Sequence, residues 1–195
     1  MSDVTIRPIS ADQHDAVMHF FDLVAYADNP NWSKCFCMER LIPNYASTTK
    51  EENRSARSAL IRSGTANGLV AYRLGRVVGW CHAAPKPGLH GLIPGATPTT
   101  GAIVCFVVAP DQRRQGIATA LLDAAIDHLR DRGMTEVEAY PVAADQEGNW
   151  PQVNYMGALS MYLGAGFEVV DARGDRRRVR KTLAADERQD AEDGM

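Results

Sequence analysis

The sequence contains few cysteines, no long apolar run and no strong excess of charge, and each shortage excludes a class of protein. Four cysteines in 195 residues are too few for a disulfide scaffold, so we expect reduced thiols. No stretch reaches membrane-spanning length, and the opening "MSDVTIRPIS" lacks the features of a signal peptide. A net charge of -3 gives no overall attraction to nucleic acid or anionic lipid. We therefore expect a cytoplasmic protein with neither a nucleic-acid nor a membrane partner.

Two common phosphate-binding loops are missing as well. There is no Gly-x-x-x-x-Gly-Lys-Ser/Thr loop and no Gly-x-Gly-x-x-Gly after the first strand, which disfavours ATP, GTP and dinucleotides as ligands. The chain does have 45% hydrophobic residues, enough for one well-buried core in a chain of this length. We predict one domain over residues 1–183 and a charged, disordered tail over residues 184–195.

Local patterns predict the elements of the first half. "VTIRPI" alternates like a strand, and capping-box spacing at Ser10 and Gln13 predicts that a helix follows it. The same spacing at Thr49 and Glu52 predicts a second helix. The apolar face of this second helix is predicted at Ala56, Ala59 and Leu60. "GLVAYRL" and "VVGWCHAA", separated by Gly75 and Arg76, predict a hairpin, and residues 85–99 predict a mobile surface loop.

The second half predicts a parallel pair of strands. "GAIVCFVVA" is nearly continuous in apolar residues, which is typical of a central strand buried on both faces. An amphipathic helix and the strand "EVEAYPV" follow, and a strand, helix and strand in this order indicate parallel pairing. A polar loop at 144–153, a short helix and the strands "GFEVVDA" and "RVRKTL" complete the chain. The predicted fold is α/β (α+β), with a mixed, mostly antiparallel sheet, a central parallel pair and helices on both faces.

The turn between the central strand and its helix is suited to anions. The helix begins near Ile117, so its unpaired N–H groups and the positive end of its dipole lie at the end of the strand. Gly116 allows close approach of a bulky phosphate, and Arg113 and Arg114 add positive charge. A diphosphate would suit this site. The alternative is an ordinary helix start preceded by solvated arginines.

Two segments resemble the GNAT superfamily of N-acetyltransferases. Arg113-x-x-Gly116-x-Ala118, after an apolar strand and "AP", resembles the Arg/Gln-x-x-Gly-x-Gly/Ala signature of that superfamily. "ALSMYLGAGFEVV" resembles its short helix carrying a tyrosine, followed by Gly-Phe-Glu and a strand. The resemblance implies a single-domain GNAT-like fold and acetyl-CoA as cosubstrate, with no metal. It places the pyrophosphate and pantetheine on the following residues: Phe106, Val107, Val108, Arg113, Arg114, Gln115, Gly116, Ile117, Ala118 and Thr119.

Acetyl transfer needs an oxyanion donor, a proton for the departing thiolate and a base for the amine. Tyr162 matches the tyrosine that lies near the sulfur of CoA in this superfamily, and the alternative is a tyrosine that only packs in the core. A backbone N–H near Val108 is the implied oxyanion donor. The central strand has no carboxylate, so Glu138 and His82 are the candidate bases, although a structural role for His82 is the simpler alternative.

The stretch "NWSKCFCMER" has an unusual Cys-x-Cys pair. A zinc site can be written with Cys35, Cys37, Cys81 and His82, but the spacing is tighter than usual for zinc, so buried thiols are favoured and no metal is predicted. In the resembled fold this segment forms a wall of the acceptor pocket. The predicted pocket residues are Trp32, Phe36, Met38 and Tyr155, the last standing where the superfamily has an asparagine.

The sequence therefore predicts an acetyl-CoA-dependent N-acetyltransferase whose acceptor is the primary amine of a small molecule or peptide, attacked by direct transfer. One alternative is a CoA-binding sensor or interaction protein without turnover, because the strand lacks a carboxylate. Another is an enzyme that uses a different acyl-CoA. A homodimer is left open.

Overall fold

A computed structural model describes residues 4–92, 94–143 and 155–183 of the chain, so the tail at 184–195 and the loop at 144–153 lie outside the described residues. The described strands form one seven-stranded sheet in the order β1-β2-β3-β4-β5-β7-β6. Their bounds are β1 (Val4–Pro8), β2 (Leu69–Arg73), β3 (Arg76–Pro85), β4 (Thr100–Val108), β5 (Glu136–Ala139), β6 (Glu168–Arg173) and β7 (Arg176–Thr182). The pairing of β4 with β5 is parallel and the other pairings in this sheet are antiparallel. The predicted fold class is confirmed.

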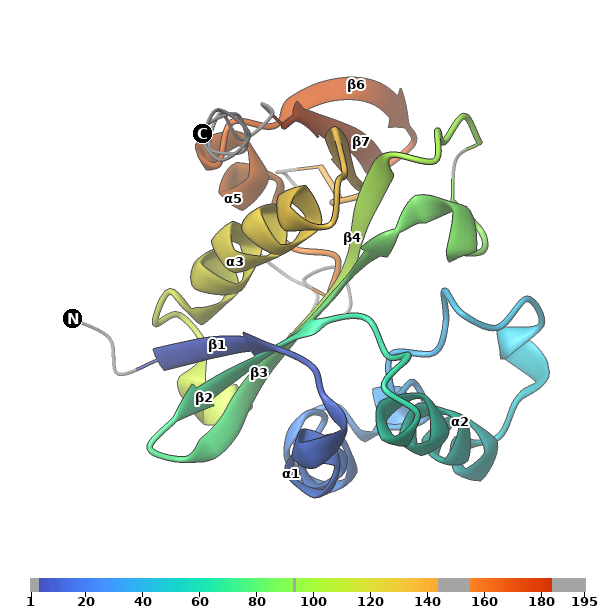
Figure 1. Cartoon of the computed structure of the whole chain (residues 1–195), viewed down its shortest axis with the longest axis vertical. Coiled ribbons are helices and arrows are strands. Elements are labelled where there is room, and N and C mark those ends of the chain that lie inside the picture. Colours follow the sequence, from blue (N-terminus) through green and yellow to red (C-terminus); the bar gives the residue numbers. More distant parts are fainter. Residues whose placement is uncertain (1–3, 93, 144–154, 184–195) are drawn as a thin grey trace, which may run out of the picture.

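Helices cover both faces of the sheet (Figure 1), as the sequence predicts. Two helices, α1 (His14–His19) and α2 (Lys50–Arg62), lie on one face, and α3 (Ile117–Asp131) and α5 (Leu159–Gly164) lie on the other. Helix α1 continues as the π-helical turn η2 (Phe20–Val24). Short 3-10 turns are η1 (Ala11–Gln13), η3 (Pro30–Trp32), η4 (Tyr45–Ser47), η5 (Lys86–Gly88) and η6 (Pro110–Gln112). Within the described ranges, no helix combines the length and apolar content that crossing a bilayer requires.

Each face of the sheet has its own apolar core. Leu121, Leu122 and Leu129 of α3 are fully buried in the first cluster, which also contains Tyr162 of α5. The second cluster lies under α1 and the loop that follows it, and it contains the aromatic side chains Phe20, Phe21, Phe36 and Trp80. Neighbouring side chains of one strand therefore enter different cores. Only side chains on the same face of the sheet can come together in a site.

The two predicted capping boxes have different outcomes. At the start of α2 the box is formed: the Glu52 N–H donates to Thr49 Oγ1 at 3.1 Å, and the Thr49 N–H donates to the Glu52 carboxylate at 2.7 Å. The box at Ser10 is wrong, because the Ser10 hydroxyl donates to the nearby carboxylate of Asp12 at 2.6 Å. A 3-10 turn, η1, precedes α1 there.

The buried face of α2 also differs from the prediction. Ala59 is exposed, whereas Asn53, Arg57 and Ile61 are buried. These three positions recur every four residues, so the helix is amphipathic with a polar pair inside its buried face. The apolar pattern missed this face because a buried arginine and asparagine count as surface residues in sequence reasoning.

Two boundaries shift relative to the sequence prediction. The hairpin between β2 and β3 turns at Leu74 and Gly75, both left-handed with φ of 49° and 75°, one residue before the predicted turn. Strand β3 runs to Pro85, and the next side chain, Lys86, is only 4% exposed. The segment predicted as a surface loop therefore begins with a buried anchor.

Candidate functional site

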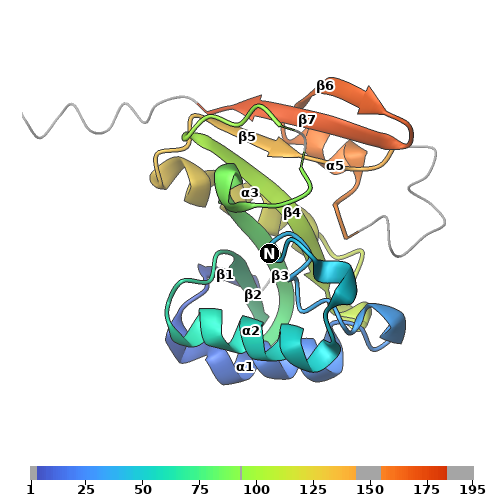
Figure 2. The same ribbon diagram turned by 90° about the vertical axis from the view of Figure 1, so that its right-hand side faces the viewer.

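Strands β4 and β5 separate after a short stretch of pairing. Strand β4 pairs with β3 as far as Val108, but it pairs with β5 only from Thr100 to Ile103. Beyond its last ladder residue, the chain of β5 stays close to β7, where Val142 bridges Arg176. The two strands diverge in Figure 2. Residues 104–108 of β4 therefore have an edge that β5 does not cover.

The N–H groups of Phe106 and Val108 face this uncovered edge. The Ala109 N–H points the other way, to Val78 of β3 at 2.9 Å, and neighbouring residues of a strand alternate in direction. The Phe106 N–H donates to the carbonyl of Tyr155 at 2.7 Å. An extended ligand with amide groups can pair with such an edge in the manner of an added strand.

At the end of β4 the chain turns into α3 through Gly116. This glycine is the N-cap of the helix with φ of 80°, and a Cβ built there would meet no atom within 4 Å. The space above it is open, and the first N–H groups of α3 have no partner within the helix. Both properties suit an anion at the helix N-terminus.

The polar residues of this turn divide into engaged and free groups. Arg113 forms a bidentate ion pair with Asp28, and its Nε donates to the Val108 carbonyl at 3.2 Å. The Gln115 side chain accepts a hydrogen bond from Arg73. Arg114, left-handed with φ of 62°, is exposed, which leaves it accessible to an incoming phosphate.

Tyr162 lies next to the uncovered edge of β4. Its ring packs edge-on to Phe106, with 6.3 Å between the ring centroids, and to Phe167 at 5.2 Å. Its hydroxyl donates to the Met156 carbonyl at 2.9 Å. Burial raises the pKa of Tyr162 well above its usual range, so the hydroxyl stays protonated at neutral pH. A proton-donating role is compatible with this position and stays a prediction.

The predicted acceptor wall is only partly brought together. The rings of Trp32 and Tyr155 are in contact, with centroids 5.4 Å apart, and Tyr155 also contacts Tyr26 at 5.8 Å. Phe36 and Met38 do not reach the surface with them, because both are buried in the core beneath α1. Burial raises the pKa of Tyr155 to about 12. The partly exposed aromatic side chains on this face are therefore Trp32 and Tyr155, and the buried ring of Tyr26 supports Tyr155 from below.

His82 contacts the cysteine stretch and not a carboxylate. Its Nδ1 lies 3.4 Å from Cys37 Sγ, while its Nε2 is buried and has no hydrogen-bond partner within the described part of the chain. Burial raises the pKa of the Cys37 thiol, but a hydrogen bond with Cys105 and the charge of His82 outweigh burial, so the net pKa is well below the usual value. His82 pairs with Cys105 across β3 and β4, which places it one strand away from the uncovered edge.

A buried arginine fixes this cysteine stretch. Arg57 of α2 donates to the Phe36 carbonyl at 2.9 Å and to the Cys37 carbonyl at 2.6 Å, and its guanidinium lies 5.1 Å from the centroid of the Trp80 ring. Phe36 and Cys37 are both left-handed, with φ of 43° and 55°, a conformation that non-glycine residues rarely adopt. Sequence reasoning missed Arg57, because an arginine on a helix is normally assigned to the solvent-exposed side.

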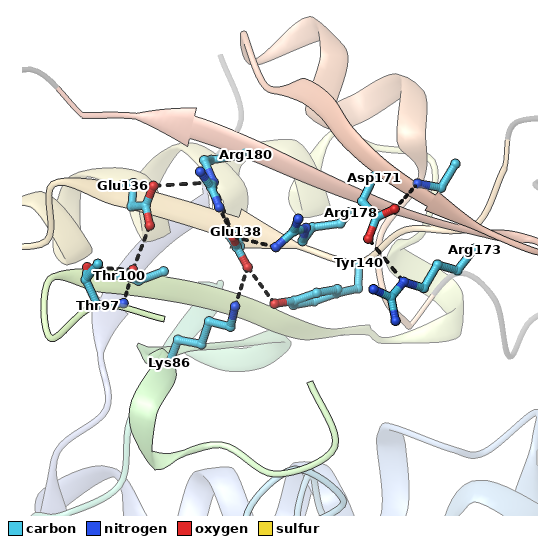
Figure 3. A network of polar contacts seen from close by, with 11 residues as sticks. Lys86, Thr97, Thr100, Glu136, Glu138, Tyr140, Asp171, Arg173, Arg178 and Arg180 are labelled. Carbon is cyan, nitrogen blue, oxygen red and sulfur yellow. Dashed lines mark hydrogen bonds and ion pairs between the residues drawn. The ribbon is translucent and has the colours of Figure 1, made fainter. Parts of the chain in front are cut away.

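Glu138 is the centre of a buried ion-pair network (Figure 3). Lys86 and Tyr140 donate to its Oε2 at 2.6 and 2.7 Å, and Arg180 donates to its Oε1 at 2.6 Å. Burial raises the pKa of Glu138, but the hydrogen bonds from Lys86, Arg180 and Tyr140 outweigh it and the net shift is downward. Glu138 stands beside Ala102 of β4, four residues and about 13 Å along the strand from Phe106.

Two further features lie apart from this site. A surface hollow of about 450 Å³ between α1 and α2 is lined by none of the predicted site residues; its lining is His14, Asp15, Met18, His19, Asp22, Leu23, Arg54, Ser58 and Arg62. Among the described residues, no group of three or more His, Cys, Asp or Glu side chains is arranged to bind a metal ion. Cys81 enters the core under α3, on the opposite side of β3 from His82.

Comparison with known proteins agrees with this architecture. A model of the acetyltransferase (GNAT) family matches residues 32–151, more than half of the chain. Comparison with curated proteins gives no match.

Solved structures with the same fold include three N-acetyltransferases or relatives. PaiA N-acetyltransferase from Thermoplasma acidophilum, solved in complex with coenzyme A, is 17% identical with a TM-score of 0.56, over 94% of this chain and 100% of that chain. YncA from Salmonella typhimurium, solved with its cofactor acetyl-CoA, is 17% identical with a TM-score of 0.55, over 95% and 99%. A GCN5-related N-acetyltransferase from Kribbella flavida is 17% identical with a TM-score of 0.58, over 93% and 98%. These likenesses show the shared fold.

Proposed function

The chain belongs to the GNAT family of acetyltransferases, and on that premise we propose that it transfers the acetyl group of acetyl-CoA to a primary amine by direct attack. The observation that carries this proposal is the uncovered edge of β4, which ends at the open turn before α3. One continuous surface thus offers backbone groups for the pantetheine amides and helix N–H groups for the pyrophosphate.

The residues of the turn have distinct proposed roles in binding acetyl-CoA. The N–H groups from Gln115 to Thr119 face the pyrophosphate, and Gly116 leaves the space for it. Arg114 supplies a mobile cation, since Arg113 is occupied by Asp28 and orients the turn instead. The edge from Phe106 to Val108 receives pantetheine through its backbone groups.

In the transfer step, an N–H at the uncovered edge stabilises the oxyanion that forms on the acetyl carbonyl. The Phe106 N–H is a candidate beside the predicted Val108, and the Tyr155 carbonyl that now accepts from it is released when the thioester takes its place. Tyr162 then donates a proton to the departing thiolate. Its ring already contacts Phe106, so a small shift of its hydroxyl from the Met156 carbonyl suffices.

For the base, the geometry favours His82 over Glu138. The carboxylate of Glu138 is saturated by Lys86, Arg180 and Tyr140, and its lowered pKa makes it a poor proton acceptor. His82 is nearer to the uncovered edge, no described residue hydrogen-bonds to its Nε2, and it acts as a base only in its neutral form, without the charge that lowers the pKa of Cys37. Its buried position means that a water molecule or the amine itself must reach it.

The test is calorimetric titration with acetyl-CoA, CoA and ATP, followed by a screen of amines for CoA release. We expect saturable binding of the two CoA compounds over ATP, and CoA release that depends on the added amine. Binding without amine-dependent release would support the non-catalytic alternative. Tighter binding of succinyl-CoA or a longer acyl-CoA would support a different acyl donor. Failure of the folded protein to bind any CoA compound would overturn the proposal.

A cytoplasmic location, the absence of nucleic-acid and membrane partners, and the question of a homodimer stay predictions. The proposed transfer of an acetyl group from acetyl-CoA to an amine does not depend on them.

A further inference from the structure

In the part of the chain that the structure describes, the network around Glu138 contains more cationic than anionic side chains. Lys86, Arg178 and Arg180 surround the carboxylates of Glu138 and Glu136 (Figure 3). Lys86 and Glu138 are almost completely buried, with 3% and 0% of their side chains exposed. Among the described residues, three cations therefore face two carboxylates, and the network is buried at its centre, while Arg178 and Arg180 at its edge are 18% and 34% exposed.

Arg178 is the member of this network without an adequate partner. Its Nη1 is 3.5 Å from Glu138 Oε1, too far for a good hydrogen bond, because Arg180 already occupies that oxygen at 2.6 Å. Its Nε is buried and has no hydrogen-bond partner among the residues that the structure describes. Asp171, which stands opposite Arg178 on β6, accepts instead from Arg173 and from the Ala172 N–H. The described residues thus leave the guanidinium with unfilled donors, which is costly for a side chain only 18% exposed.

The position of Arg178 relates it to the uncovered edge of β4. The pair Ala139 and Val179 places Arg178 beside Tyr140, and the pair Ile103 and Ala139 places Tyr140 level with residue 104 of β4. Phe106 lies two residues further, about 7 Å along the strand. Along the strand direction, Arg178 is therefore the cation of this network nearest to Phe106, on the strand β7 that lies beyond β5 from β4.

Arg178 also faces the acceptor side of the sheet. Val179, its neighbour on β7, is buried in the core under α3, so Arg178 points to the opposite face. That face carries the partly exposed aromatic rings of Trp32 and Tyr155. An acceptor bound beside the uncovered edge of β4 would meet Arg178 on the side toward β7 and aromatic rings on its other side.

We propose that the acceptor amine carries a carboxylate close to its nitrogen, as in a free amino acid, and that Arg178 binds this carboxylate. This inference rests on the proposed acetyltransferase function and names the substrate class of the same site. A guanidinium fork matches a carboxylate in shape and charge, and the added anion balances the network. The same cations repel an ammonium group, so they favour the neutral amine that attacks the thioester. Polyamines and peptide amino termini lack this anion and are poorer acceptors.

The experiment compares each of a panel of L-amino acids with its own carboxamide as acceptor, at saturating acetyl-CoA. The two compounds differ only in the charge at the carboxyl group. With the unaltered protein we expect kcat/KM for the amino acids to exceed that for the amides by about tenfold or more, as a charge-assisted bidentate pair would give. In Arg178→Met this preference is lost through a higher KM for the amino acids, with the amides changed by less than about twofold.

Arg177→Met is the matched control. Arg177 is the neighbouring residue of β7, it points to the other face, and its Nη1 donates to the carbonyls of Gly174 and Arg176. It should retain the preference for amino acids. Arg178→Lys keeps the charge without the fork and should retain part of the preference. Arg178→Lys also tests the contact with the carboxylate if Arg178→Met does not fold. Titration with CoA shows whether each variant is folded.

The other outcomes would contradict either the role of Arg178 or the proposed function. Amides acetylated as well as amino acids, or an unchanged preference in both folded Arg178 variants, would overturn this inference and leave the acetyltransferase proposal standing. A loss of CoA affinity in Arg178→Met with an unchanged preference would assign Arg178 to a phosphate of CoA and overturn it too. CoA binding without acetylation of any amine would instead remove the proposed function, and this inference with it.

Discussion

Gly116→Leu tests the proposed anion site at the start of α3, and Gly133→Leu, just after the other end of that helix, provides the control. Gly133 follows α3 at its other end with φ of 78°, against 80° for Gly116, and a Cβ at either position meets no atom within 4 Å. Gly116→Leu and Gly133→Leu therefore impose the same backbone strain without a clash. They differ in that only Gly116 lies at the positive end of the helix dipole.

The expected magnitudes follow from these two effects. A left-handed conformation costs a non-glycine residue about 1–2 kcal/mol, so both variants should lose similar stability. For a domain of this length, each kcal/mol lowers Tm by about 2–4 °C. If leucine at 116 also removes one charge-assisted hydrogen bond to a phosphate, binding weakens by about 1.5–3 kcal/mol, or more than tenfold in Kd.

Calorimetric titration with CoA and thermal unfolding, run on both variants and the unaltered protein, measure the two effects separately. We expect equal losses of Tm, and a weaker Kd only in Gly116→Leu. Unchanged CoA affinity in Gly116→Leu would refute the assignment of the pyrophosphate to this turn. An equal loss of affinity in both variants would mean that strain in α3, and not the ligand contact, decides binding.

Three further predictions concern individual residues. Tyr162→Phe should keep CoA affinity and lower kcat; an unaltered rate in single-turnover acetylation would assign Tyr162 to packing. The folded pKa of Glu138 is lowered, so its stabilising contribution is present above the unfolded value of about 4.3 and is lost as pH falls through the folded value. In urea unfolding at pH 7, Glu138→Gln should therefore be less stable than the unaltered protein by about 3 kcal/mol. This difference in stability should shrink below about pH 4. A difference that does not change with pH would contradict the charged network. Thr49→Ala should cost about 1 kcal/mol, while Ser10→Ala, which removes no cap hydrogen bond, should cost little; similar losses would contradict the two observed cap geometries.

The order of elements and the turn that we propose as an anion site could be predicted from the sequence because both depend on local patterns. An apolar run for β4, a glycine at the helix start and a leucine stripe on α3 are sufficient to place a buried strand, a turn and a helix. The GNAT resemblance rests on these same residues. The structure confirms the fold class that followed from them.

The acceptor side could not be predicted in the same way. Phe36 and Met38 were predicted in the pocket wall but are buried, because Arg57 anchors this segment from twenty residues further along the chain. On α2, Ala56 and Leu60 pack against the core as predicted, but the predicted Ala59 is exposed and Arg57 is buried instead. A charged side chain counts as a surface residue until a fold supplies carbonyls that compensate its burial.

The sequence by itself determined which elements form, their order and the chemistry of the turn before α3, since each is set by neighbours within a few residues of the chain. Only the tertiary structure decided that Glu138 is enclosed by cations from β7 and η5, that His82 meets a thiol, and that Arg178 is left without a full set of partners. These contacts join residues that are 40 or more positions apart, such as Lys86 with Glu138 and Cys37 with His82. Charge balance and burial at such places depend on which strands become neighbours, and no local pattern encodes that.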